Sequence, residues 1–221
     1  GRQSQSRPKR TRHQTLSVTT VPKKGYNSTL IEYSKRENIP VEWEVQKISE
    51  ICDIESGNVF PLQYQNGDNG KIPFIKVSDM NKPENSIYVS RSTNNITLQI
   101  ANSISAKIFP ENTIIFPKIG ATIFTHKRGI LKKESCYDNN LMGLIPKKIY
   151  YKFLYYWMDK INLEYFAQTT ALPYLNDKIV GDLKLPIPSL PEQQKIALIL
   201  SNVDNLIQNT DKLIEKTTRL K

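Results

Sequence analysis

The sequence SLPEQQKIALILSNVDNLIQNTDKLIEKTTRLK, residues 189–221, decides how the rest of the chain is organised. Apolar and threonine side chains recur in it at alternating spacings of three and four, at Ile196, Ile199, Val203, Leu206, Thr210, Leu213, Thr217 and Leu220. This heptad pattern predicts one long amphipathic helix, about 45 Å in length. A second apolar row, formed by Leu200, Ile207 and Ile214, makes the stripe wider than a single seam. We therefore expect the helix to pack on more than one neighbour.

The start of this helix is marked by Ser189 and Glu192, which fit a capping box, and by Pro191 in the first turn. One interpretation is an ordinary amphipathic helix that lies on its own domain. The other is a protruding arm that needs a partner helix, and the length of the heptad pattern favours it. The residues predicted to pair with that partner are Ile196, Ile199, Val203, Leu206, Leu213 and Leu220.

Composition limits the class of protein. The chain has 221 residues, 38% of them hydrophobic, which is enough for a real core. Its two cysteines, Cys52 and Cys136, and its two histidines, His13 and His126, form no metal-binding pattern, and we expect neither a disulfide framework nor a metal site. The two cysteines fit a reducing, cytoplasmic setting, and we expect a cytoplasmic protein. No apolar run approaches about 20 residues, so we expect no membrane span.

The net charge of +10 is concentrated in two places. Residues 1–36 contain nine Lys and Arg against one Glu, giving +8, and we expect this basic leader to be disordered. Residues 118–133 contain five basic residues and no acid, giving +5, whereas the remaining residues, at +10 − 8 − 5 = −3, are nearly neutral. One concentrated basic segment on a nearly neutral domain favours a surface that meets a polyanion on one side.

Residues 37–188 are predicted to form one α+β domain, followed by the helical arm at 189–221. Short strands bounded by Pro, Gly or Asn are predicted at residues 72–77, 87–89, 106–109, 113–116, 122–125 and 141–145, with a further strand at 183–187 that leads into the arm. This spacing is typical of a mixed, mostly antiparallel sheet. Residues 150–168 are predicted to form a helix whose many aromatic side chains belong to the core rather than to a base-stacking surface.

The basic segment KIGATIFTHKRGILKK, residues 118–133, is the first candidate for contact with DNA. Its glycines permit close approach of the backbone, and its basic side chains suit phosphates. The candidate residues are Lys118, Thr122, Lys127, Arg128, Lys132 and Lys133. A solvated hairpin with ordinary surface lysines is the alternative. A second candidate is the loop that contains Thr169, Thr170 and Tyr174.

Enzymatic functions find little support in the sequence. There is no Asn/Asp-Pro-Pro-aromatic motif or Gly-rich loop for adenine methylation, and no Gly-x-x-x-x-Gly-Lys-Ser/Thr for a nucleotide-driven motor. Asp182-Leu183-Lys184 is a minimal nuclease-like triplet, but it lacks a second carboxylate and is best explained by chance. We expect no catalytic residue and no cofactor in this chain.

Five segments together resemble the specificity subunits of type I restriction–modification systems. They are IPVEWEVQKISEI (39–51), IPFIKVSDM (72–80), PKIGATI (117–123), TTALPYLN (169–176) and LPIPSLPEQQKIALILSNVDNLI (185–207). The last segment is the most specific, and the order of all five strengthens the match.

The resemblance implies a target recognition domain that reads one half of a split DNA sequence. It also implies that the long helix pairs antiparallel with a second one, as a spacer and as a docking platform for methyltransferase subunits. S-adenosylmethionine would then be a cofactor of that methyltransferase, and restriction subunits would join through the complex. The relatives have two domains and two helices, whereas this sequence has one of each. A half-sized subunit that dimerises and a piece of a longer chain are both open.

Two other functions compete with DNA reading. The chain could be a coiled-coil assembly protein whose globular head binds protein, or a fragment of a fusion between a methyltransferase and a specificity subunit. Sequence-specific, salt-sensitive binding to DNA distinguishes a DNA reader from the assembly protein.

Overall fold

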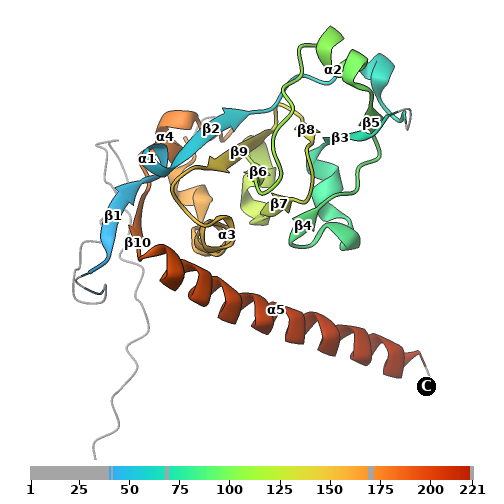
Figure 1. Cartoon of the computed structure of the whole chain (residues 1–221). Helices are drawn as coiled ribbons and strands as arrows, with labels where there is room; N and C mark the ends of the chain where they lie inside the picture. Colours follow the sequence, from blue (N-terminus) through green and yellow to red (C-terminus); the bar gives the residue numbers. More distant parts are fainter. Residues whose placement is uncertain (1–39, 41, 68–69, 169–171, 220–221) are drawn as a thin grey trace, which may run out of the picture.

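The computed structural model describes residues 40, 42–67, 70–168 and 172–219 (Figure 1). The predicted basic leader, residues 1–36, lies outside the described residues. The same is true of Thr169 and Thr170 in the second candidate loop and of Leu220 in the arm.

A five-stranded sheet forms the centre of the head. Its strand order is β2 (Cys52–Ser56), β9 (Leu141–Pro146), β6 (Ile114–Pro117), β7 (Gly129–Leu131) and β4 (Tyr88–Val89). All neighbouring strands in it are antiparallel except β4 and β7, which are parallel. The parallel pair lies at one edge of the sheet and becomes important for the site described below.

Two smaller sheets complete the strand pairing. In one, β3 (Ile72–Ile75) pairs antiparallel with β5 (Asn95–Ile96) and parallel with β8 (Cys136–Tyr137). In the other, β1 (Glu44–Lys47) pairs antiparallel with β10 (Lys184–Ile187). Because β10 leads directly into the arm, this pair ties the beginning of the described head to the base of the arm. The predicted α+β class with a mixed, mostly antiparallel sheet is confirmed.

The helices are short apart from two. They are α1 (Ile48–Ile51), α2 (Leu98–Ser103), α3 (Tyr151–Lys160), α4 (Asp177–Gly181) and α5 (Leu190–Thr218). Short 3-10 helices lie at η1 (Leu62–Tyr64), η2 (Val77–Asn81), η3 (Pro83–Asn85), η4 (Gly120–Thr125) and η5 (Leu163–Phe166). Figure 1 shows α3 between the central sheet and α5. The long C-terminal helix predicted from the heptad pattern is confirmed as α5.

Three predicted elements differ from the structure. Residues 122–125, predicted as a strand, form part of η4, because the hydroxyls of Thr122 and Thr125 donate to carbonyls three residues earlier and favour a turn. The helix predicted for 150–168 ends at Lys160, and Asn162 then caps η5 through its side chain. Residues 106–109 form only an isolated bridge, between Phe109 and Ser135.

The core lies on both faces of the central sheet. Ile114 and Phe116 of β6 pack in the cluster that includes α3, whereas Ile115 packs in a second cluster with Leu131 and Tyr137. This is the alternation expected of a strand covered on both sides. On α3, the side chains of Phe153, Leu154, Tyr155 and Met158 are buried, so the core assignment is confirmed for this face. It is wrong for Tyr165, which lies beyond the helix in η5 and is 53% exposed.

The arm is anchored to the head through its first turns. Gln193 is buried, its Oε1 accepts from the backbone N–H of Tyr150 at 2.8 Å, and its Nε2 donates to the carbonyl of Pro188 at 2.9 Å. Ala197 is fully buried against the head. Ser189 is the N-cap residue, but its side chain makes no capping hydrogen bond, so the predicted capping box is not formed. Tertiary contact through Gln193, rather than a local cap, fixes the start of α5.

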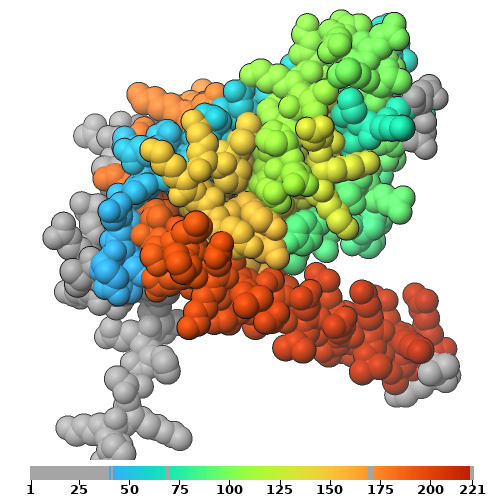
Figure 2. All heavy atoms as spheres, in the orientation of Figure 1, coloured from blue at the N-terminus to red at the C-terminus, as the bar shows by residue number. Residues whose placement is uncertain are grey.

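Beyond this anchor the arm protrudes. The hydroxyl of Tyr156 on α3 donates to Oδ2 of Asp204 at 2.6 Å, and from Asn209 to the last described residue every side chain is exposed. Leu206 and Leu213, two of the predicted pairing residues, are 67% and 64% exposed. Figure 2 shows this half of α5 standing clear of the head. The structure therefore favours the protruding arm over a helix that lies entirely on its own domain.

We predict that Gln193→Ala lowers the free energy of unfolding by about 1–3 kcal/mol, because the partly buried N–H of Tyr150 and the buried carbonyl of Pro188 both lose the partner that Gln193 supplies. Gln194→Ala is the matched control, since Gln194 is the exposed neighbour on the same helix. Urea unfolding followed by circular dichroism measures both variants. Equal stability of the two would show that Gln193 does not anchor the arm.

Candidate nucleic-acid interface

One end of the central sheet carries Lys118. Strands β2 and β6 both end there and β9 begins there, because both pair antiparallel with β9. The ammonium of Lys118 donates to the hydroxyl of Ser56 at 2.6 Å, and its backbone N–H donates to the carbonyl of Asn140 at 2.9 Å. These contacts hold Lys118 against the ends of the neighbouring strands.

The structure joins this end to the described part of the second candidate loop. The backbone N–H of Gly120 donates to the carbonyl of Pro173 at 2.7 Å, and the backbone N–H of Leu175 donates to the carbonyl of Lys118 at 2.9 Å. Gly120 has a positive φ of 68°, which lets the chain turn there. Two segments that the sequence presents about fifty residues apart therefore form one surface, which we call the Lys118 edge and define as Lys118, Thr122 and Tyr174.

Lys132 and Lys133 lie at the opposite end of the sheet. Strand β7 runs antiparallel to β6, so the residues that follow β7 are far from those that follow β6. Lys133 lies in a shallow groove whose walls also include Glu111 and Glu134. The basic segment does not form one patch: its charges are divided between two ends of the sheet, with the exposed Lys127 just after η4.

Arg128 must be removed from the predicted DNA contacts. It is only 5% exposed, and its guanidinium donates to the carbonyls of Met158, Ile161 and Lys127 at 3.1, 3.2 and 2.8 Å. The first two of these carbonyls belong to the C-terminal end of α3, where cations are favoured. Burial lowers the pKa of Arg128 to about 10, against the opposing charge of Asp159. Arg128 caps a helix inside the protein and does not face solvent.

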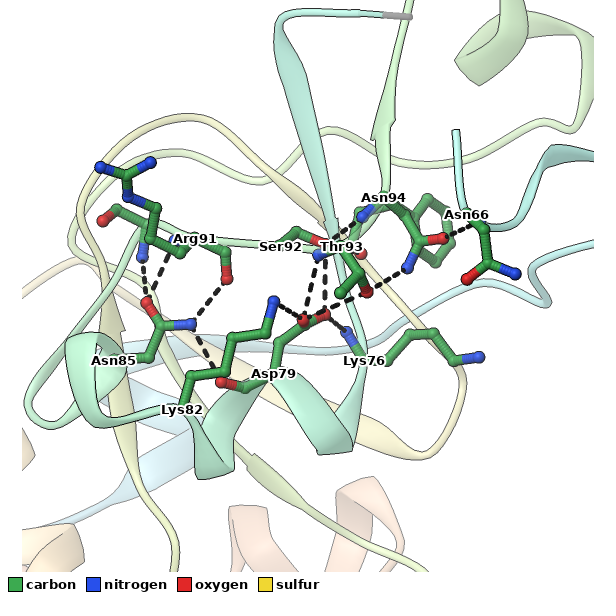
Figure 3. Close-up of polar contacts among 11 residues, drawn as sticks. Asn66, Lys76, Asp79, Lys82, Asn85, Arg91, Ser92, Thr93 and Asn94 are labelled. Atoms are coloured by element: carbon green, nitrogen blue, oxygen red, sulfur yellow. Dashed lines mark hydrogen bonds and ion pairs between the residues drawn. The ribbon is translucent and has the colours of Figure 1, made fainter. Parts of the chain in front are cut away.

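A buried polar network, not foreseen from the sequence, lies beside the other end of the sheet (Figure 3). The carboxylate of Asp79 is fully buried and accepts from the backbone N–H groups of Lys76 at 2.9 Å and Thr93 at 3.1 Å. It also accepts from the hydroxyl of Ser92 at 3.1 Å and pairs with the ammonium of Lys82 at 2.8 Å. Burial acts to raise the pKa of Asp79, but the hydrogen bonds and the charge of Lys82 outweigh it and lower the pKa.

Asn85 continues the network and fixes the next loop. Its Oδ1 accepts from the backbone N–H groups of Ser90 and Arg91 at 3.1 and 3.0 Å. Its Nδ2 donates to the carbonyls of Arg91 and Asp79 at 2.6 and 2.9 Å. All four hydrogen-bonding positions of this buried amide are therefore occupied. Three of them hold the backbone at residues 90–91.

Other kinds of site are not apparent in the part of the chain that the structure describes. No group of three or more His, Cys, Asp or Glu side chains there could hold a metal ion, and no helix there is long and apolar enough to cross a membrane. Cys52 and Cys136 are buried and unpaired. Asp182 of the nuclease-like triplet pairs with Lys47 at 2.8 Å on the surface.

A family model for the type I restriction modification DNA specificity domain matches residues 40–219. The chain belongs to this family. It is 31% identical over 179 residues to the type I restriction enzyme MjaIX specificity subunit of Methanocaldococcus jannaschii, a match that covers 79% of this chain and 40% of that one. It is 26% identical over 145 residues to the EcoR124I/EcoR124II specificity subunit of Escherichia coli, covering 63% of this chain and 35% of the relative. The chain thus spans less than half the length of these relatives.

Solved structures show the same fold. A structure concerned with complex assembly and conformational transition of the type I R-M system matches with a TM-score of 0.64 at 15% identity, over 83% of this chain and 44% of the other. The HsdS subunit from Thermoanaerobacter tengcongensis matches with a TM-score of 0.58 at 16% identity, over 81% and 41%.

We predict that Arg128→Met lowers the free energy of unfolding by about 2–4 kcal/mol, because it leaves the carbonyls at the end of α3 unsatisfied in the core. Lys127→Met, at the exposed neighbouring position, is the matched control and should change stability little. Chemical denaturation measures both. A stable Arg128→Met variant with selectively weakened DNA binding would contradict the structural role of Arg128.

We predict that the contribution of Asp79 to stability depends on pH. A lowered pKa means that this contribution is fully present above the ordinary Asp pKa of about 4 and is lost as the pH falls toward the lower folded value. The stability difference between wild type and Asp79→Asn should therefore be largest near neutral pH and shrink below about pH 4. Asp53→Asn, which removes an exposed ion pair with Lys147, is the control and should cost less than about 1 kcal/mol. A difference that grows on acidification would contradict the prediction.

Proposed function

We propose that this chain is a DNA sequence-specificity module in which the head reads one half of a bipartite target. The match of head and arm together to the DNA specificity domain model carries this proposal. The curated relatives are named as specificity subunits, and we infer a binding role without catalysis for this chain. S-adenosylmethionine would then belong to a partner methyltransferase, restriction subunits would join through that complex, and the assembly would act in the cytoplasm, where the DNA is.

The head offers two candidate surfaces for DNA, one at each end of the central sheet. The Lys118 edge combines hydroxyl groups with one ammonium, and Lys127 lies close to it in sequence. Lys132 and Lys133 lie at the opposite end. Lysines of this kind supply phosphate contacts, which set the register of a protein on the duplex without reading sequence. Thr169 and Thr170 stay predicted contacts.

The arm is proposed to set the distance to a second recognition unit. Its anchor on α3 fixes its direction, and a helix is a stiff spacer that rises 1.5 Å per residue. Its exposed apolar residues are Leu190, Leu198, Ile199, Leu200, Val203, Leu206, Ile207, Leu213 and Ile214. Ile196, also predicted to pair, is instead partly buried against the core of the head. A stripe of this length, without a partner in the described part of the chain, suits an antiparallel helix from a second copy or a second recognition unit, and additional surface for methyltransferase subunits.

We predict that replacing Leu206 and Leu213 together with Asp abolishes pairing through the arm, because carboxylates would be buried without partners in the helix interface. Leu62→Asp, at an exposed apolar position of the head, is the control and should leave pairing intact. Analytical ultracentrifugation over a concentration series measures the assembly state. A wild-type chain that stays monomeric throughout, or a double variant that still dimerises, would contradict the pairing assigned to this stripe.

We predict that binding of the assembled chain to duplex DNA weakens steeply with salt and favours one sequence over scrambled duplex. The target is first identified by selection from a random duplex pool, and affinities are then measured by fluorescence anisotropy. Replacing Lys127, Lys132 and Lys133 with Gln should lower the salt slope by about 0.9 for each phosphate contact that is lost. Weak binding that is indifferent to both sequence and salt would favour the head as a protein-binding module instead.

A further inference from the structure

We propose that Arg91 reads a guanine in the major groove of the target and that buried Asn85 and Asp79 are positioning residues for it. This inference rests on the proposed function, because it assigns the DNA face of the head to the end of the sheet that carries Lys132.

The parallel pairing of β4 and β7 brings Arg91 and Lys132 to the same end of the sheet, Arg91 two residues after β4 and Lys132 directly after β7. Tyr88 and Val89 of β4 align with Ile130 and Leu131 of β7 in the same direction, and the backbone N–H of Lys132 donates to the carbonyl of Val89 at 3.0 Å. Both strands therefore end at the same end of the sheet. Arg91 and Lys132, far apart in sequence, therefore both follow strands that end there.

Among the residues that the structure describes, the charged groups of Arg91 and Lys132 form no ion pair. Both residues are exposed, whereas Lys82 nearby is bound to Asp79. The acidic groups near this end, Glu111 and Glu134, lie in the groove with Lys133. Arg91 and Lys132 can therefore bind an external anion or a base edge without first breaking an internal contact.

The difference between arginine and lysine assigns base reading to Arg91 and phosphate contact to Lys132. A guanidinium presents a planar fork of donors that matches O6 and N7 of guanine, whereas an ammonium acts as a point charge suited to phosphate. Of the arginines that the structure describes, Arg128 is buried and Arg219 lies at the end of the arm. Arg91 is therefore the exposed arginine of the described head, and Lys132 at the same end of the sheet is suited to a phosphate contact.

The polar network explains how Arg91 is held. Asn85 forms three hydrogen bonds to the backbone of Ser90 and Arg91, and Asp79 binds the side chain of Ser92 and the backbone of Thr93. Figure 3 shows the Arg91 guanidinium pointing away from this network while its backbone lies within it. A fixed backbone reduces the entropy lost when the side chain binds, which favours specific recognition.

The test compares the duplex selected by the assembled wild-type chain with a scrambled duplex, by fluorescence anisotropy at fixed salt. Arg91→Ala should weaken binding to the selected duplex by about 10-fold to 100-fold and change binding to the scrambled duplex little. Arg91→Lys should also lose discrimination, because it keeps the charge but not the fork. Lys132→Gln should weaken binding to both duplexes alike. Arg219→Ala is the matched control and should change neither.

A repeated selection with Arg91→Ala gives the second readout. One guanine position of the recovered sequence should become degenerate while the others persist. If Arg91→Ala and Arg91→Lys keep the full preference for the selected duplex, the proposal is wrong. If Arg91→Ala weakens both duplexes equally, Arg91 contacts phosphate and does not read a base. A wild-type chain that selects no sequence at all would refute the proposed function itself.

The positioning role of Asn85 is tested separately. Asn85→Ala should lower the ratio of selected to scrambled affinity, measured at temperatures where thermal denaturation shows the variant to be folded, and it should add little to Arg91→Ala in the double variant. Asn85→Asp retains the oxygen that accepts from Ser90 and Arg91 and should recover part of the ratio. Equal weakening on both duplexes would assign Asn85 a purely structural role.

Discussion

The direction in which α5 leaves the head is the constraint on which the functional argument depends. Fully buried Ala197 allows the helix to approach α3 closely, and Gln193 joins the start of α3 to the segment that precedes the arm. Farther along, burial and the hydrogen bond to Asp204 raise the pKa of Tyr156, so its phenol remains the donor well above neutral pH. A spacer measures a distance only if its base cannot swing, and these contacts fix the base while the rest of the helix stays available to a partner.

Features that depend on short periods could be predicted from the sequence. The heptad pattern predicts α5, and the short apolar run at residues 113–116, bounded by Asn112 and Pro117, predicts β6. Burial on one side of a helix, or on both sides of a strand, is visible within a few residues of sequence. The candidate site was less predictable. Arg128 has the same charge as Lys127, and only the fold reveals that it lies under the end of α3. In the same way, Asp79 looks like the polar end of a strand until the loop at residues 90–94 is folded over it.

Basic residues that lie close together in the sequence are also not close together on the surface of the protein. The five basic residues of segment 118–133 are dispersed because the segment passes through η4 and then crosses the sheet as β7. A compact surface arises instead where different segments meet, as at the Lys118 edge. Pairing between distant segments, set by the order of strands, therefore decides which side chains can contact one ligand together.

The network around Asp79 and Asn85 is costly to bury, since each polar group gives up its contact with water and gains only a modest net amount from its new partners. Apolar side chains of similar shape could hold the same volume with comparable stability. They could not hold a backbone by hydrogen bonds that act in particular directions, because apolar contact is not directional. Directional hydrogen bonds therefore suit a loop that must present one side chain in one orientation. The proposed roles of spacing and reading would thus fall to separate parts of the molecule. Apolar packing and three hydrogen bonds fix the arm, whereas buried directional bonds fix the loop. Because the two sets share no residue, a change in one can leave the other intact, and under the proposed function the loop could vary without altering the distance between half-sites.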